Sequence, residues 1–198
     1  MAKVQRPLQS GTASGQVGKA TVHFDWKGVH AVRSYVVPAN PRTIAQISVR
    51  TKFTNCLEDW HSPLMLPVDK EAWKRWAEVL RKPMTSLNAY TSERMKVTTK
   101  DLTWHNVWSY TEVQKTPGGL DFDVKGTKPN PLRCEVGPTL SYRPYVFNGT
   151  WDTVTSACHF HVTGLAENVP IYIRVIPAET GYWGFSGIYK SRTGKTGG

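Results

Sequence analysis

The chain has 198 residues, with 39% hydrophobic and 20% charged residues, ordinary values for a globular protein. This length suffices for one large domain or two small ones, and we expect two. No apolar run approaches the roughly 18 residues that a membrane span requires, so we expect a soluble chain without a membrane partner. Cys56, Cys134 and Cys158 are spaced too widely for a zinc motif and are odd in number, which predicts buried, reduced thiols.

Positive charge is concentrated in the first half of the chain. Residues 1–50 contain seven Lys or Arg against one acidic residue, whereas residues 101–150 contain five of each. This asymmetry indicates a polyanion or an acidic protein surface as a neighbour of the N-terminal part. A basic surface that only aids solubility is the alternative interpretation.

The pattern of the N-terminal region predicts an irregular segment followed by a pair of strands. Residues 1–19 contain glycine, serine and threonine but no sustained apolar pattern, which predicts a flexible basic arm. In residues 20–26 apolar residues alternate, with Trp26 on the apolar face, and the Lys27-Gly28 pair favours a tight turn. A β-hairpin is therefore predicted.

The stretch NPRTIAQ predicts a helix that starts at Asn40, because asparagine is a favourable N-cap and Pro41 fits the first helical position. At ~100° per residue, one apolar stripe forms the expected core face. We expect Ile44 and Ile47, on the other side, to be covered as well. We expect the polar residues of the stripe to hydrogen-bond the backbone of the hairpin. Phosphate contacts through Arg42 and Arg50 are the alternative. The stripe consists of Val49, Phe53, Cys56, Leu57 and Trp60, and Arg42 and Gln46 extend it toward the N-terminus.

Two further short helices are predicted. The first has Asp69 as its N-cap and ends before the next proline, and the second covers residues 86–96. Tryptophans at helical spacing are usually core residues. We therefore expect Trp60, Trp73 and Trp76 to pack together and against the hairpin.

An ordered series of motifs runs through this part of the chain. SGQVG, FDWKG and NPRTIAQ follow one another over residues 14–46, and Arg50, Phe53 and SLNAY at residues 86–90 continue the series. The series resembles the N-terminal pattern of small, uncharacterised proteins encoded by bacterial phages and prophages. The resemblance implies a virion or virion-assembly component and transfers no catalytic residue. It covers under half of the chain, and Tyr90 stands where the pattern has phenylalanine.

Residues 97–193 read as short alternating strands separated by Pro, Gly and Asn turns, which predicts an antiparallel β-sandwich. Asn148-Gly149 predicts one of its hairpin turns. The segment 163–194 resembles the closing half of a fibronectin type III domain, and implies that Tyr172 is a tyrosine-corner residue bonded to the loop near Leu165. The expected fold is thus α+β, with a flexible arm (1–19), a hairpin and helical domain (20–96), a fibronectin III- or immunoglobulin-like sandwich (97–193) and a flexible tail (194–198).

No local signature of an enzyme is present. The sequence lacks a motif for a nucleophile with its base, paired catalytic carboxylates, a metal or a cofactor, so we expect no catalytic residue and no cofactor. His159 and His161 share one face of a predicted strand, but no third ligand lies nearby in the sequence. Asp121 and Asp123 share a strand face in the same way, and we expect all four at solvated surfaces.

Three hypotheses follow from these patterns. The first is a non-enzymatic structural or assembly protein of a phage-like virion, homo-oligomeric and in contact with other virion proteins, which attaches by its N-terminal domain and displays the sandwich. The second is a nucleic-acid-binding accessory protein that uses the basic N-terminal half, in which Trp26, His30, Arg33 and Tyr35 are interleaved, with Arg33 and Arg50 as candidate ligand-facing residues. The third is a surface glycan-binding module, with Tyr182, Trp183 and Phe185 as stacking candidates.

Overall fold

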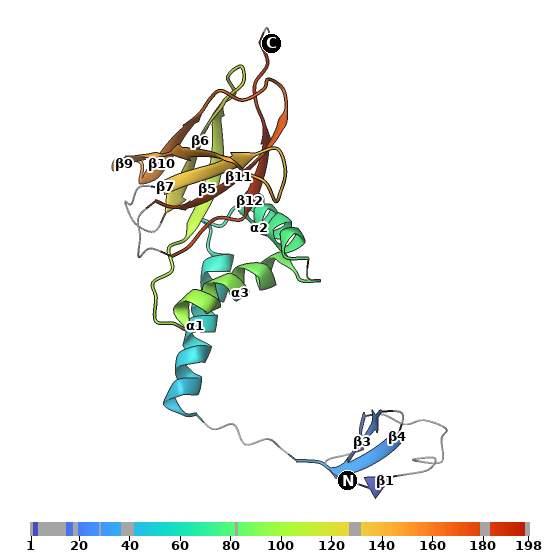
Figure 1. The fold of residues 1–198 in the computed structure, drawn as a ribbon. Helices are drawn as coiled ribbons and strands as arrows, with labels where there is room; N and C mark the ends of the chain where they lie inside the picture. The colour runs from blue at the N-terminus through green and yellow to red at the C-terminus, as the bar shows by residue number, and fades with distance from the viewer. Residues whose placement is uncertain are drawn as a thin grey trace. The chain divides into compact units, whose positions relative to one another are not determined.

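The computed structural model describes residues 2–3, 15–17, 20–27, 29–36, 42–81, 83–126, 132–178 and 183–196. The chain divides into two compact units, residues 1–43 and 44–198, which can be followed by colour in Figure 1. The predicted α+β fold, with an N-terminal hairpin, three helices and an antiparallel sandwich, is confirmed. The boundary between the two units falls between residues 43 and 44. The sequence pattern, in contrast, changes from helical to strand-like near residue 97, where we expected the domain boundary. The helices and the sandwich thus belong to one compact unit.

The first unit is a small antiparallel sheet with the strand order β1-β4-β3-β2. The predicted hairpin is present, and it pairs Thr21 with Ser34 and Trp26 with Val29 at its two ends. β1 and β2 fall within the segment expected to be a flexible arm, and they pair with β4 and β3 respectively. The strands are β1 (Ala2–Lys3), β2 (Gly15–Val17), β3 (Thr21–Trp26) and β4 (Val29–Ser34).

The second unit contains two four-stranded antiparallel sheets, with the orders β5-β6-β10-β9 and β12-β11-β7-β8. Asn148-Gly149 joins strands of different sheets, so the hairpin predicted there is wrong. Gly149 is required for another reason, because a Cβ on it would lie 2.3 Å from Sγ of Cys158. The strands are β5 (Val107–Gln114), β6 (Leu120–Gly126), β7 (Leu132–Gly137), β8 (Tyr145–Asn148), β9 (Thr150–Asp152), β10 (Ala157–Val162), β11 (Pro170–Pro177) and β12 (Ile188–Arg192).

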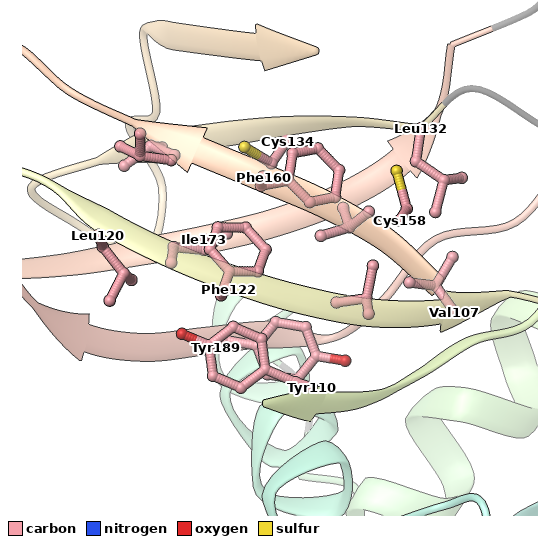
Figure 2. Packing of buried hydrophobic residues seen from close by; sticks show 14 of the residues in the cluster. Val107, Tyr110, Leu120, Phe122, Leu132, Cys134, Cys158, Phe160, Ile173 and Tyr189 are labelled. Carbon is pink, nitrogen blue, oxygen red and sulfur yellow. The ribbon is translucent and has the colours of Figure 1, made fainter. Parts of the chain in front are cut away.

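The interior of the sandwich is made by alternate residues of both sheets. Figure 2 shows the rings of Phe122 and Phe160 in the middle of this core, with their centroids 4.9 Å apart. Cys134 and Cys158 are buried free thiols, as expected, and burial raises the pKa of Cys134 to about 12. Period-two patterning therefore predicted the core face of these strands correctly.

The three helices are α1 (Ile44–His61), α2 (Pro67–Val79) and α3 (Ser86–Thr98). α1 begins at Ile44, four residues later than predicted, and the expected cap at Asn40 and Pro41 lies outside the described residues. α2 begins at Pro67 with Leu66 as its N-cap, so Asp69 is in the first turn and is not the cap.

The predicted core face of α1 is buried only in the second half of the helix. Cys56 and Trp60 are buried, whereas Val49 and Phe53 of the same stripe are exposed. The expectation that Ile44 and Ile47 are covered is also wrong, since Ile44 is 88% exposed and Ile47 is exposed as well. Periodicity identified the apolar side of the helix, but its buried residues, Cys56 and Trp60, both lie in its C-terminal half.

α2 packs directly on the sandwich. A Cβ on Gly187, just before β12, would lie 2.3 Å from the backbone of Ala72 in α2, so only glycine permits this approach. Ala72 belongs to the core of the sandwich. The guanidinium of Arg75 donates to the carbonyl of Ile188 over 3.4 Å. The helical layer and the sandwich therefore share one interior.

The carboxylate of Asp69 fixes this arrangement. Oδ2 accepts the backbone N–H groups of Leu66 and Ser109 at 2.8 and 2.9 Å, and Oδ1 accepts the hydroxyl of Tyr189 at 2.7 Å and the N–H of Tyr110 at 3.4 Å. Asp69 is 1% exposed, and burial raises its pKa above the ordinary value although the four donors lower it. Ser109 has a φ of 55°, where the register of β5 shifts against β6. One side chain thus joins the start of α2, a bulge in β5 and β12.

We predict that Asp69→Asn lowers the free energy of unfolding by about 2–3 kcal/mol, because an amide nitrogen then faces backbone donors that keep no acceptor. The matched control is Asp101→Asn, whose 89% exposed side chain pairs with Lys52, because an exposed ion pair contributes little to stability. Urea denaturation measures both. Equal effects of the two substitutions would contradict the central role of Asp69.

Candidate functional site

The predicted tryptophans lie in one aromatic cluster between the helices and the sandwich. Trp60 and Trp73 are buried there around Tyr90, with ring centroids 5.6 and 5.2 Å from it, and Trp76 packs at the edge. The cluster also includes Trp104, from the segment before β5, and Trp108, near the start of β5. These tryptophans form a structural core and do not present a stacking surface.

A buried polar network ties the same cluster together. Arg94 of α3 forms an ion pair with Asp59 of α1 and donates to the hydroxyl of Tyr90 over 3.0 Å. Asn106 donates to Asp59 over 2.6 Å and accepts from Tyr90 and from Nε1 of Trp104, both at 2.8 Å. Burial raises the pKa of Tyr90, so its hydroxyl is a donor at neutral pH. Each of these four side chains thus has a partner in the network, as polar groups in a folded interior require, although Nε of Arg94 is buried without a hydrogen-bond partner among the described residues.

Of the three aromatic residues proposed as a stacking surface for sugars, the structure describes two. Phe185 is half-buried, with its ring centroid 5.3 Å from Trp73, 5.2 Å from Trp76 and 5.5 Å from Trp104. Trp183 is 48% exposed, and Tyr182 lies outside the described residues. Phe185 therefore packs in the interior of this unit, whereas the side chain of Trp183 is exposed.

A cation completes this cluster on the outer face of the second sheet. The guanidinium of Arg174 lies 4.4 Å from the ring centroid of Trp76 and 4.1 Å from that of Phe185. Burial lowers the pKa of Arg174, although Glu135 opposite it raises the pKa. Tyr172, two residues earlier on β11, lies on the same outer face, since Ile171 and Ile173 point inward. The expected bond from Tyr172 to the loop near Leu165 is not among the hydrogen bonds of the described residues; Thr193 ties that loop by donating to the carbonyl of Ala166 over 2.7 Å.

Two Asp–His pairs lie on the outer face of the first sheet. His159 pairs with Asp123 and His161 with Asp121, directly across from each other on β10 and β6. The side chains of both histidines are substantially exposed, as expected for a solvated face. Across the described ranges, no three or more His, Cys, Asp or Glu side chains are placed to hold a metal ion.

In the first unit, Arg33 is exposed on β4 and its guanidinium lies 5.5 Å from the ring centroid of Phe24. This unit carries a high positive charge, with six Lys or Arg against one acidic residue over residues 1–43. The side chain of Trp26 lies outside the described residues. Arg33, one of the predicted ligand-facing residues, is thus exposed on a strand of this basic unit.

The first half of α1 exposes the remaining candidate residues. Arg42 precedes the helix, and Gln46, Arg50 and Phe53 are exposed on it. Figure 1 shows that this half extends beyond α3 and the sandwich, within the second unit. An apolar helix surface of this kind is typical of an interaction site. None of the described helices is both long enough and apolar enough to span a membrane.

A cavity of about 460 Å³ lies at one end of the sandwich. It is formed by the loop between β7 and β8 and the loop between β10 and β11, and sequence reasoning did not single it out. Tyr142 and Tyr145 are the exposed aromatic residues of its lining. The tyrosines stand among prolines in SYRPYVF, a pattern that favours an extended loop but does not show that a second loop faces it. The lining comprises Gly137, Pro138, Tyr142, Pro144, Tyr145, Gly164, Leu165, Ala166, Val169, Pro170 and Ile171.

We predict that Phe185→Ala lowers the free energy of unfolding by about 3 kcal/mol, because it leaves a void among three tryptophans and the Arg174 guanidinium. Trp183→Ala, the control two residues away, should change it by less than about 0.5 kcal/mol, since that side chain is exposed. Urea unfolding followed by tryptophan fluorescence and by far-UV circular dichroism measures both. A small effect of Phe185→Ala would show that the aromatic cluster does not depend on this ring.

Comparison with known proteins adds no family assignment to these observations. No protein-family model matches the chain, and neither a curated protein nor a solved structure is detectably similar to it. The interpretation of the site therefore depends on the contacts, the exposure and the charges described above.

Proposed function

We propose that the chain is a non-enzymatic structural or assembly protein of a phage-like virion. It attaches to neighbouring virion proteins through its N-terminal unit and the first half of α1, and it displays the β-sandwich. The observation that carries this proposal is the exposed apolar surface of α1, which needs a partner. The motif series from SGQVG to SLNAY, which resembles phage- and prophage-encoded proteins, supports the virion setting.

The apolar stripe of α1 is continuous, although only half of it is covered. Val49 and Phe53 lie on the same side of the helix as Cys56 and Trp60, which pack in the aromatic cluster. Ile44 and Ile47 add apolar surface on the other side of the first turns. A helix that is apolar on both sides is typical of a segment surrounded by other protein, and an unpacked helical segment of this length is marginally stable in water. Covering these turns in an assembly would therefore stabilise them.

Charge indicates what kind of protein surface covers the helix. From residue 44 to residue 57 the helix carries Arg50 and Lys52 and no acidic residue. Lys52 already pairs with Asp101 over 2.8 Å. A partner groove that is apolar in its centre and acidic at its rim would complement this stretch.

The strand order of the sandwich supports a display role. When β5 to β12 are lettered A, B, C, C′, D, E, F and G, the two sheets read A-B-E-D and G-F-C-C′. This is the order of immunoglobulin-type sandwiches, an architecture shared by many surface domains. Repeated copies of such a domain in a symmetric particle would turn weak contacts into strong binding.

We predict that Phe53→Glu removes the chain from purified particles, because it places an acid in the apolar stripe of α1. The control is Asn55→Glu, an exposed position about 160° around the helix from Phe53. Particles from cells that express each variant are purified and their proteins quantified by mass spectrometry, with thermal unfolding of the free chain measured in parallel. Absence of the unaltered chain from particles, or equal incorporation of both variants, would contradict the proposal. So would a large loss of stability in free Phe53→Glu, which would show that the chain itself covers this face.

Binding of nucleic acid is the second candidate function, because the lysines and arginines of the first unit outnumber its acidic residues and would attract phosphate groups. It predicts that the full chain binds a DNA of about 30 nucleotides, with affinity that falls at least tenfold between about 50 and about 200 mM salt. Arg33→Ala should reduce the salt slope by about 1, whereas Arg192→Ala in the sandwich should not change it. Fluorescence anisotropy measures both, and a flat salt response would reject this function.

A further inference from the structure

Among the described strands of the sandwich, four lie at sheet edges, and three of these are blocked against the addition of another strand. β5 has register shifts and gives two of its N–H groups to Asp69. β12 is approached by α2 and carries two exposed cations, Lys190 and Arg192. β9 has only three residues and ends in Asp152. Bulges, charges, shortness and cover by a helix are the features by which natural sheets protect their edges.

Within the part of the chain that the structure describes, β8 has none of these protections apart from its modest length. Its sequence is YVFN, without charge or proline, and among the described strands it pairs only with β7. The pairing with β7 runs in continuous register from Arg133–Asn148 to Val136–Tyr145. Tyr145 and Val146 are exposed. A regular, uncharged edge with exposed apolar side chains is suited to accept another strand.

The cavity at the end of the sandwich adjoins this edge, because Tyr145 belongs to both. Its volume of about 460 Å³ is within the range of ligand pockets. Its lining is apolar and aromatic, with prolines and glycines but no charged side chain. Apart from the hydroxyls of Tyr142 and Tyr145, the lining offers a sugar no polar side chain, whereas an apolar side chain would fill the cavity.

We propose that β8 binds an extended, uncharged segment of a partner protein by strand addition, with one apolar side chain of that segment seated in the adjoining cavity. The backbone of β8 supplies affinity through main-chain hydrogen bonds, and the cavity selects the side chain. This inference goes beyond the attachment role of α1, and it uses residues that the attachment role does not.

A second copy of this chain is a poorer occupant than a foreign segment. If two β8 strands paired antiparallel about their centre, Asn148 and Gly149 of one copy would come opposite Tyr145 and Pro144 of the other. These residues offer no apolar side chain to the cavity. The cavity would then stay empty, and burial of its lining would contribute nothing to binding.

The test uses a display library of random twelve-residue peptides, selected on the immobilised full chain. Parallel selections use Val146→Lys and Val113→Lys, a matched pair, because Val146 on β8 is 56% exposed and Val113 on β5 is 55% exposed. We expect peptides with alternating apolar residues to be enriched on the unaltered chain and on Val113→Lys. Their dissociation constants should rise at least tenfold on Val146→Lys, since a lysine blocks the edge.

Two further measurements identify the binding mode. The best peptide is remade with N-methyl groups on alternate backbone nitrogens; one set should lose at least tenfold in affinity and the other should not, because alternate N–H groups of a strand face the partner. Tyr142→Ser should weaken the same peptide about tenfold through the cavity. Circular dichroism checks that each variant is folded.

Three outcomes would overturn the proposal. The first is the absence of enrichment on the unaltered chain relative to Val146→Lys. The second is a selected peptide that binds both lysine variants equally, which places it elsewhere. The third is concentration-dependent dimerisation of the unaltered chain that Val146→Lys abolishes, which assigns the edge to a second copy. None of these measurements involves particles, so they are independent of the outcome for Phe53→Glu.

Discussion

The second unit depends on one buried carboxylate. Asp69 accepts four hydrogen bonds from three separate parts of the chain, at Leu66, at Ser109 and Tyr110, and at Tyr189. A buried charge is tolerated only with such compensation, so the start of α2, the bulge of β5 and the hydroxyl on β12 must meet at one point. This meeting sets the position of α2, which carries Trp73 and Trp76 into contact with Phe185. The aromatic cluster and the sandwich are therefore joined to each other. The hydrogen bonds of Asp69 define the position of α2 more narrowly than apolar packing alone would.

The second half of α1 is held by a different mechanism. Asp59 and Trp60 join the network of Arg94, Tyr90 and Asn106, which is polar inside and aromatic around it. In the first half, Lys52 pairs with Asp101, and the apolar side chains Ile44, Ile47 and Val49 are exposed. A helix that is buried at one end and exposes apolar side chains at the other presents those turns rigidly enough to be recognised, while their stability still gains from a partner. This is the physical basis for interpreting α1 as an attachment element.

The sequence predicted those features that are determined by local pattern. Alternation in LDFDV and ACHFHV identified two central strands, because each has one face in the core and one in solvent. Helical periodicity identified the apolar side of α1 but not its exposure, because periodicity does not show whether another element packs against that side. Asp69 was assigned as an N-cap because an acid at the first turn and an acid at the cap have the same local signature. Its actual role depends on donors 40 and 120 residues away, and the cavity likewise depends on two loops that no spacing brings together.

The two proposed contact surfaces differ in chemistry, and this difference suits a protein with more than one partner. The surface of α1 is apolar with cations and no acid along its first 14 residues, so its recognition has an electrostatic component that salt screens. The edge of β8 and its cavity carry no charge, so recognition there depends on main-chain hydrogen bonds and apolar burial, which salt does not screen. A segment that fits one surface is a poor fit to the other. Each proposed surface would therefore exclude the partner of the other by its own chemistry, without a conformational change of the chain.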